Sequence, residues 1–173
     1  KEDLISLAAI KAAENSDLIL IPEASHNSIG IAENLISRYV KDNEKEKKIR
    51  KIFFPMIRDT KRRDEIISEQ IEKLKPEIKE IKEGKSTKIF FPVIGDSVLY
   101  STGAYLVEGL KKFFPEIQVE FIPGISAHSM AFACAKKFMA MGEDIFCVIS
   151  GTADGGKILS RSEERRVGKE CRS

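Results

Sequence analysis

The sequence predicts an α/β fold, with a mainly parallel sheet and flanking helices. One observation is that short apolar runs, several closed by Pro, alternate along the chain with amphipathic helical patterns. A second observation is the length and composition. A chain of 173 residues is long enough for one domain with a buried core, and 42% hydrophobic with 32% charged residues is typical of a globular protein. Because parallel strands are joined through crossover helices, this alternation favours a sheet that helices cover.

The first elements are short. Apolar residues recur at helical spacing over 4–15, and the run DLILIP (17–22) is typical of a buried strand. Ser28 is placed to cap a second helix that reaches Tyr39, because its hydroxyl can accept a hydrogen bond from a first-turn amide. After a charged connection, 49–56 is expected as the second strand, again ended by Pro.

The second half continues the alternation. A long charged helix with a stripe of isoleucines is expected over 60–83, and Pro76 should kink or divide it. The remaining elements are expected to be strands at 87–94, 117–123 and 144–150 and helices at 98–114 and 125–138.

Charge and cysteine content exclude several classes of protein. The net charge of +2 is too small to indicate nucleic-acid binding by itself. No apolar run approaches the roughly 20 residues that span a bilayer, and the first residues lack a signal-peptide pattern. Cys134, Cys147 and Cys171 have the spacing of neither a disulfide framework nor a metal cluster, so we expect reduced thiols and a cytoplasmic protein.

Residues 161–173, RSEERRVGKECRS, differ from the rest of the chain. They carry five basic and three acidic residues and one aliphatic residue, Val167, too little apolar surface to fold alone. They resemble the translation of a sequencing-library adapter read in frame; the alternative is a basic disordered tail that contacts anions. We therefore expect a domain over 1–160 and a non-native tail over 161–173.

Polar residues and glycines gather where the expected strands end. The stretches 22–27, 55–59, 95–102 and 123–126 each follow a strand. In parallel α/β sheets, ligands bind beyond the carboxyl ends of the strands. The sequence therefore predicts a ligand site at that edge.

The Gly95-Asp96 step in this edge allows two interpretations. Gly95 lets a ligand approach the backbone and exposes the amides of the next helix, which suit an anion such as a carboxylate. Asp96 would repel a phosphate and attract a cation, a hydroxyl or an amine, and the Lys of a phosphate loop is missing. Alternatively, Asp96 only caps a helix that begins near Val98.

Other candidate site residues also allow both a functional and a purely structural interpretation. Pro123-Gly124 makes a turn and Ser126 could cap the next helix, while His128 and His26 have no third partner at metal-binding spacing. Arg58 begins a basic cluster that could bind a polycarboxylate or could form the solvated first turn of the long helix. No nucleophile motif such as Gly-x-Ser-x-Gly is present, so hydrolysis is unsupported.

Together, these segments resemble the tetrapyrrole (class III) methyltransferases over residues 2–156. The resemblance is carried by FFPMIRD, a long charged helix ending in KEGK, GDSVLYST, VEFIPGISAHSMAFA and DIFCVISGT. It is greatest to the branch that methylates C20 of precorrin-2 or cobalt-factor II in cobalamin (vitamin B12) biosynthesis. FPM-x-RD and GD-x-x-LYST are specific to that branch, whereas PGIS is shared more widely.

The chain also departs from that family pattern. Members open with a Gly-rich strand and loop before the first helix, and they carry a second α/β domain after the point where the tail begins. Ser97 stands where members usually have Pro, which removes a fixed φ and adds a hydroxyl. We therefore expect the N-terminal domain of a two-domain enzyme, truncated at both ends and inactive by itself.

By motif match, the resemblance implies which residues contact the methyl donor, S-adenosylmethionine. They are Gly95, Asp96, Leu99, Ser101, Thr102, Ser126, Ala127 and Ser150. Arg58 and the basic residues after it would meet the carboxylates of the tetrapyrrole substrate. No general base is assigned, no metal ligand is expected, and the presence of cobalt in the substrate stays open.

The implied reaction moves a methyl group from the sulfonium to C20, so the protein's task is alignment and desolvation. Family members are commonly homodimers, and no nucleic-acid or membrane partner is expected. The competing hypothesis is a non-catalytic α/β domain that binds a nucleotide-like ligand or a partner chain. Convergence of 95–102 and 124–127 on one pocket would favour the methyltransferase; separated loops would favour the binding domain.

Overall fold

A computed structural model describes residues 4–24, 30–40, 49–55, 57, 59–81 and 87–150. The chain divides into two compact units, Lys1–Met130 and Ala131–Ser173, and each is described by itself. The expected tail, 161–173, lies outside the described residues.

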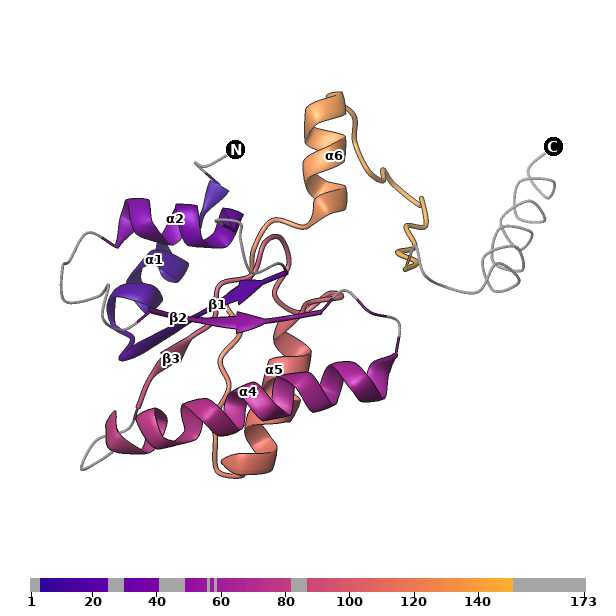
Figure 1. Cartoon of the computed structure of the whole chain (residues 1–173). Helices are drawn as coiled ribbons and strands as arrows, with labels where there is room; N and C mark the ends of the chain where they lie inside the picture. Colours follow the sequence, from indigo (N-terminus) through magenta and orange to yellow (C-terminus); the bar gives the residue numbers. More distant parts are fainter. Residues whose placement is uncertain are drawn as a thin grey trace. The chain divides into compact units, whose positions relative to one another are not determined.

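The helices and strands are, in order along the chain, α1 (Leu7–Glu14), β1 (Leu18–Glu23), α2 (Ile31–Tyr39), β2 (Ile49–Phe53), α4 (Thr60–Ile81), β3 (Ile89–Phe90), α5 (Gly103–Phe113) and α6 (Ala127–Ala135) (Figure 1). They alternate from α1 to α5, as the sequence predicts, and α6 then follows α5 with no strand between them.

The sheet has three strands in the order β2-β1-β3, and both pairings are parallel. Ile19 lies opposite Ile49 in one pairing, and Leu18 lies opposite Ile89 in the other. The central strand β1 is apolar on both faces because helices cover both faces of the sheet. The predicted α/β class, with its parallel sheet and flanking helices, is confirmed.

Successive residues of β1 pack in two different cores, since side chains alternate across a strand. Leu18 and Leu20 join a cluster with α4 and α5 that includes Ile67, Ile71 and Leu110. Ile19 and Ile21 join a second cluster, with residues of α1 and α2. Figure 1 shows α1 and α2 on one side of the sheet and α4 and α5 on the other.

Helix α4 runs as one element from Thr60 to Ile81, with Pro76 inside it. Of the two expected effects of Pro76, division of the helix is wrong, because the isoleucine stripe holds both halves on the sheet: Ile67, Ile71 and Ile78 are all buried. A kink at Pro76 stays a prediction. Beside the proline, Glu77 accepts hydrogen bonds from Arg50 of β2, with Nε–Oε2 3.0 Å and Nη2–Oε1 2.8 Å. This bidentate pair fixes the second half of α4 against β2.

Several element ends differ from the expected ones. Helix α1 begins at Leu7, where the Ser6 side chain accepts a hydrogen bond from the Ala9 amide at 3.1 Å. Helix α2 begins at Ile31 with Gly30 as its N-cap, and Ser28, the expected cap, lies outside the described residues. Capping preference fixes a helix start only to within a few residues.

The expected strands at 117–123 and 144–150 are wrong, because neither segment is a strand in the structure. Val119, Phe121, Ile145 and Phe146 are exposed. An alternating or apolar pattern produces a strand only where a neighbouring strand offers hydrogen-bond partners. The nearest strand in sequence, β3, has two residues, and Pro92 follows soon after without an amide hydrogen.

Candidate functional site

The loop between β3 and α5 contains most of the predicted site residues. Its backbone is unusual at two positions: Gly95 has φ 88°, and Tyr100, which has a side chain, has φ 51°. The first conformation favours glycine, and the second is uncommon for an aromatic residue. This loop therefore takes a specific, non-helical path from the end of the sheet to α5.

Asp96 organises that loop. Its Oδ1 accepts hydrogen bonds from the Val98 amide at 2.9 Å and from the Leu99 amide at 3.2 Å. The expectation of a helix from Val98 is wrong, because these bonds close a turn and α5 begins at Gly103. Asp96 therefore caps a turn, not a helix.

The two hydroxyl residues before α5 differ in what they do. The Ser101 Oγ accepts a hydrogen bond from the Gly103 amide at 3.1 Å, whereas Thr102, at the N-cap position, makes no side-chain capping bond. Earlier in the loop, the Ser97 Oγ is buried and has no hydrogen-bond partner among the described residues. A buried hydroxyl without a partner is costly, so Ser97 is the one residue of this loop whose polar atom calls for a further explanation.

The second predicted stretch leads into α6, which begins at Ala127. Ser126 is 8% exposed, and its Oγ lies 3.4 Å from the Ser129 amide that donates to it. The same oxygen lies 2.8 Å from His128 Nε2 and 2.9 Å from the Ser129 Oγ. Ser126 thus caps the start of α6, as expected, and also holds the imidazole of His128.

The structure brings the two stretches together. A Cβ at Gly124 would overlap the carbonyl oxygen of Gly95, and a Cβ at Gly95 would lie 3.7 Å from the carbonyl oxygen of Ile125. The backbones therefore touch where both residues lack a side chain. The two stretches therefore meet at one point, while their convergence on a single pocket, the feature that distinguishes the two functional hypotheses, stays a prediction.

The apolar residues of the first stretch remain accessible. Val98 is 66% exposed and Leu99 is 36% exposed, next to the buried Ser97 hydroxyl. The loop consequently presents amides, a carboxylate and apolar side chains within a few residues of one another.

The basic residues that follow Arg58 interact with neighbouring side chains of α4 and with Tyr105 of α5. Asp59 accepts the Arg62 amide at 3.1 Å, and the Arg62 side chain pairs with Glu65. Arg63 lies 3.7 Å from the centroid of the Tyr105 ring and pairs with Asp64. These residues form the first turn of α4, while Arg58 lies outside the described residues.

Ser150 ends the described part of the second unit and is half-buried there. Its expected position after a fifth strand is wrong, because 144–150 is not a strand. Its relation to the donor stays a prediction.

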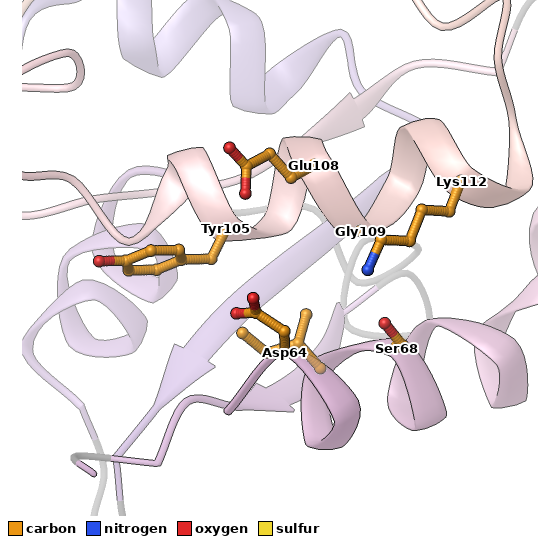
Figure 2. Close-up of a pocket in the computed structure, with 7 residues that line it drawn as sticks. Asp64, Ser68, Tyr105, Glu108, Gly109 and Lys112 are labelled. Carbon is orange, nitrogen blue, oxygen red and sulfur yellow. The ribbon is translucent and has the colours of Figure 1, made fainter. Parts of the chain in front are cut away.

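A small pocket of the structure lies between α4 and α5, away from the predicted site. Figure 2 shows Asp64 and Ser68 of α4 facing Tyr105, Glu108 and Lys112 of α5. Its volume of about 20 Å³ holds about one water molecule, so it cannot take a nucleoside-sized ligand. Among the described residues, no group of three His, Cys, Asp or Glu side chains could hold a metal ion.

Lys51 of β2 has a shifted pKa and forms ion pairs with Glu33 of α2 and Glu23 of β1. The Lys51 Nζ is 2.8 Å from Glu33 Oε2 and 3.7 Å from Glu23 Oε1. The hydrogen bond to Glu33 raises the pKa of Lys51 above its ordinary value, with a smaller contribution from the charge of Glu23. This network ties the end of β1 to β2 and α2.

Residues 1–168 match the model of the tetrapyrrole (corrin/porphyrin) methylases. The chain belongs to this family. It is 29% identical over 156 residues to the "Probable cobalt-precorrin-2 C(20)-methyltransferase" of Methanocaldococcus jannaschii, covering 90% of this chain and 62% of that protein. It is 25% identical over 162 residues to the "Cobalt-precorrin-2 C(20)-methyltransferase" of Salmonella typhimurium, covering 94% of this chain and 64% of that protein.

The chain thus spans less than two thirds of the length of these two methylase relatives. No helix in the part of the chain that the structure describes is long and apolar enough to cross a membrane.

Sequence reasoning missed Ser129 as a partner of Ser126. The signal was present, since a hydroxyl three residues after a capping serine lies within reach of the cap. The link between Ser126 and His128 had no such signal, because residues two apart face different sides of a helix. Only the non-helical backbone at Ser126 makes that contact geometrically accessible.

Proposed function

We propose that this tetrapyrrole methylase chain belongs to an enzyme that transfers a methyl group from S-adenosylmethionine to C20 of precorrin-2 or cobalt-factor II in cobalamin biosynthesis. Family membership and the names of the two relatives support this function. The observation that carries it is the contact between Gly95 and Gly124, which joins the two stretches that the donor would touch.

The residues of these stretches fit the methyl donor chemically. The contact between Gly95 and Gly124 brings the backbone groups of both stretches close together, and backbone amides and carbonyls suit the carboxylate and amino group of a methionine end. The unpartnered Ser97 hydroxyl is a polar group that a ligand or a ligand-induced loop movement could satisfy. Leu99 adds apolar contact, and Ser101, Thr102, Ser126, Ala127 and Ser150 complete the proposed donor site.

When bound, the donor supplies an activated methyl group on a sulfonium, so no covalent enzyme intermediate is needed. The loop from Gly95 to Thr102 would orient the donor and exclude water from the reacting atoms. Asp96 would act twice: it holds the turn through two amides, and its carboxylate favours a positively charged or hydroxyl group nearby.

The remaining parts of the proposal concern the whole protein. Arg58 would pair with a carboxylate of the tetrapyrrole, since guanidinium groups bind carboxylates in a bidentate manner. We also propose that residues 1–160 act as the N-terminal domain of a two-domain, cytoplasmic homodimer.

Calorimetric titration of the complete gene product with S-adenosylmethionine and S-adenosylhomocysteine tests the donor. We expect saturable binding of both and methylation of precorrin-2 or cobalt-factor II, detected by mass spectrometry. ATP serves as the control ligand, because the competing hypothesis is a nucleotide-binding domain. Binding of ATP without binding of either sulfur compound would refute the methyltransferase.

A further inference from the structure

The outer edge of β2 is a place where the sheet could pair with another chain. In the order β2-β1-β3, β2 has a neighbouring strand on one side only. The backbone groups of successive strand residues point alternately toward the neighbour and away from it. The Phe54 amide donates to the Glu23 carbonyl oxygen of β1 at 2.8 Å. The N–H and C=O groups of alternate residues, Ile49, Lys51 and Phe53, therefore face the open side.

Gln70 of α4 occupies this open side at Phe53. Its Oε1 accepts a hydrogen bond from the Phe53 amide at 2.6 Å, and its Nε2 donates to the Phe53 carbonyl oxygen at 2.8 Å. A side-chain amide carries the same kinds of donor and acceptor as a peptide group. Gln70 thus makes the pair of hydrogen bonds that a residue of an antiparallel strand would make with Phe53.

A second contact covers the start of the strand. The Arg50 Nη1 donates to the Ile49 carbonyl oxygen at 2.9 Å, while the Arg50 Nε and Nη2 bind Glu77 of α4. Gln70 and Glu77 lie seven residues apart, about 10.5 Å along a helix. Their partners Phe53 and Arg50 lie three residues apart, about 10 Å along a strand. Helix α4 therefore follows β2 in the opposite direction with matching spacing, and it holds the side chains that cover both ends of the open side.

The middle of the open side carries a charged residue. Lys51 lies between the two covered residues, and its side chain is 41% exposed. Its ammonium group is 2.8 Å from Glu33 and 3.7 Å from Glu23. Lysines, and helices that cover the edge, are two of the means by which natural proteins keep edge strands from pairing.

The position of Gln70 on α4 also indicates a role in specificity. Ile67 precedes it by three residues and Leu74 follows it by four, and both contact the apolar core. Residues at this spacing share one face of a helix, so an apolar side chain at position 70 would continue that face. A glutamine there gives up apolar burial and gains two directed hydrogen bonds to a strand edge.

We propose that α4 closes the outer edge of β2 to strand pairing, and that Gln70 is the residue that excludes a second copy of this chain. Two copies related by a two-fold axis would bring β2 against β2 in antiparallel orientation. Phe53 would then need the N–H and C=O groups that Gln70 already binds. An open row of such groups is otherwise a template for pairing. The proposal concerns the sheet alone and does not depend on the proposed function.

Hydrogen exchange of the wild-type 173-residue chain tests the closure without a substitution. The Phe53 amide faces the open side, whereas the Phe54 amide is bonded inside the sheet. If Gln70 closes the edge, the Phe53 amide should exchange nearly as slowly as the Phe54 amide. Exchange of the Phe53 amide at the rate of an unstructured amide would overturn the proposal.

A strand probe tests the exclusion itself. The probe is a fluorescein-labelled peptide with the sequence of residues 49–54, IRKIFF, which represents β2 of a second copy. Fluorescence anisotropy should show no saturable binding to the wild-type chain and saturable binding to Gln70→Leu. The same peptide with every backbone amide N-methylated should bind to neither, because it cannot donate the strand hydrogen bonds. Saturable binding of the unmodified peptide to wild type would overturn the proposal.

Two control variants separate opening of the edge from a loss of stability. Glu69→Leu places a leucine at the exposed neighbouring position and should leave the probe unbound. Gly109→Ala should destabilise the same helix layer, because its Cβ would lie 2.6 Å from Ile71 Cδ1, and yet leave Gln70 on the edge. Probe binding to Gly109→Ala as tight as to Gln70→Leu would show that instability, and not the open edge, admits the peptide, which would overturn the proposal.

Gln70→Glu provides a second opening variant if Gln70→Leu does not fold. At neutral pH its carboxylate still accepts the Phe53 amide, but it cannot donate to the Phe53 carbonyl oxygen. We expect saturable probe binding, weaker than that of Gln70→Leu where both variants fold. A folded Gln70→Leu or Gln70→Glu chain that binds no probe would show that Gln70 only stabilises the strand, and the proposal would fail.

Discussion

The backbone of Gly124 packs against the carbonyl group of Gly95 so closely that no side chain fits between them. The two glycines belong to loops that leave the same region of the fold by different routes, one toward α5 and one toward α6. Their contact sets how far apart the loops lie. It therefore determines the shape of any ligand site that both loops form.

Gly124→Ala should disturb this contact. The added methyl group must displace the Gly95 backbone, and such overpacking typically costs about 1–3 kcal/mol. Urea unfolding should show that loss, and NMR should show shifted amide signals for Val98 and Leu99 in the adjoining loop. Gly30→Ala is the matched control, because a Cβ there meets only the Pro22 carbonyl oxygen, at 3.7 Å. Unshifted amide signals in Gly124→Ala would contradict the contact.

Gly109 of α5 and Ile71 of α4 form a similar close approach in the core. A Cβ at Gly109 would lie 2.6 Å from Ile71 Cδ1 and 3.4 Å from Ile67 Cγ2. We expect Gly109→Ala to cost about 1–3 kcal/mol through overpacking. Ile71→Val removes the obstructing methyl group and by itself should cost about 0.5–1.5 kcal/mol.

The double variant Gly109→Ala with Ile71→Val separates this explanation from a general loss of helix packing. Because the valine makes room for the alanine, the double variant should be more stable than the sum of the two single losses predicts. Urea denaturation of all four proteins measures the coupling. Strict additivity would show that the methyl groups do not compete for the same space.

Gln70 of α4 supports the outer edge of β2. Its Oε1 accepts the Phe53 amide at 2.6 Å, and its Nε2 donates to the Phe53 carbonyl oxygen at 2.8 Å. Gln70→Leu removes both hydrogen bonds and should cost about 1–3 kcal/mol, with faster hydrogen exchange of the Phe53 amide. Glu69→Leu, at an exposed neighbouring position, is the control and should leave that exchange rate unchanged.

The sequence predicted what local patterns determine. The apolar run of β1 and the isoleucine stripe of α4 each depend on residues close together in sequence, and the structure confirms both. The segments 117–123 and 144–150 look equally strand-like in sequence, yet strand formation depends on a hydrogen-bonding neighbour that sequence pattern does not supply.

In the candidate site, too, local sequence predicted some features, whereas others depend on tertiary contacts. Asp96 was expected just after a strand, but β3 ends at Phe90, and a side chain that can accept two amides can cap a turn as readily as a helix. The contact between Gly95 and Gly124 is tertiary, so their glycines suggest close approach without identifying the partner.

Lys51 should make stability depend on pH in the alkaline range. Its pKa is raised in the folded state, mainly by the hydrogen bond to Glu33, so protonation favours folding. The stabilisation is complete below the pKa of an unfolded-state lysine and is lost as pH rises through the higher folded-state pKa. Unfolding free energies of wild type and Lys51→Met, measured across that range, should converge at high pH. Glu33→Gln should already reduce the difference at neutral pH, and a pH-independent difference would contradict this.

Asp96 distinguishes a structural role from a binding role at the proposed site. Asp96→Asn keeps an oxygen that can accept the Val98 and Leu99 amides, but it removes the charge. Asp96→Ala removes both. If the carboxylate only closes the turn, Asn should retain both stability and donor affinity, whereas Ala should lose about 1 kcal/mol of stability, the typical value of a hydrogen bond.

The proposed function predicts a different pattern, which calorimetry and urea unfolding together can detect. Asp96→Asn should fold as stably as wild type yet bind S-adenosylhomocysteine roughly tenfold or more weakly, because hydrogen bonds to a charged group contribute about 1.5–3 kcal/mol. Asp96→Ala should lose affinity and stability together. Wild-type affinity in Asp96→Asn would remove the carboxylate from the donor site and leave it with the turn alone, since only the charge distinguishes the two side chains there.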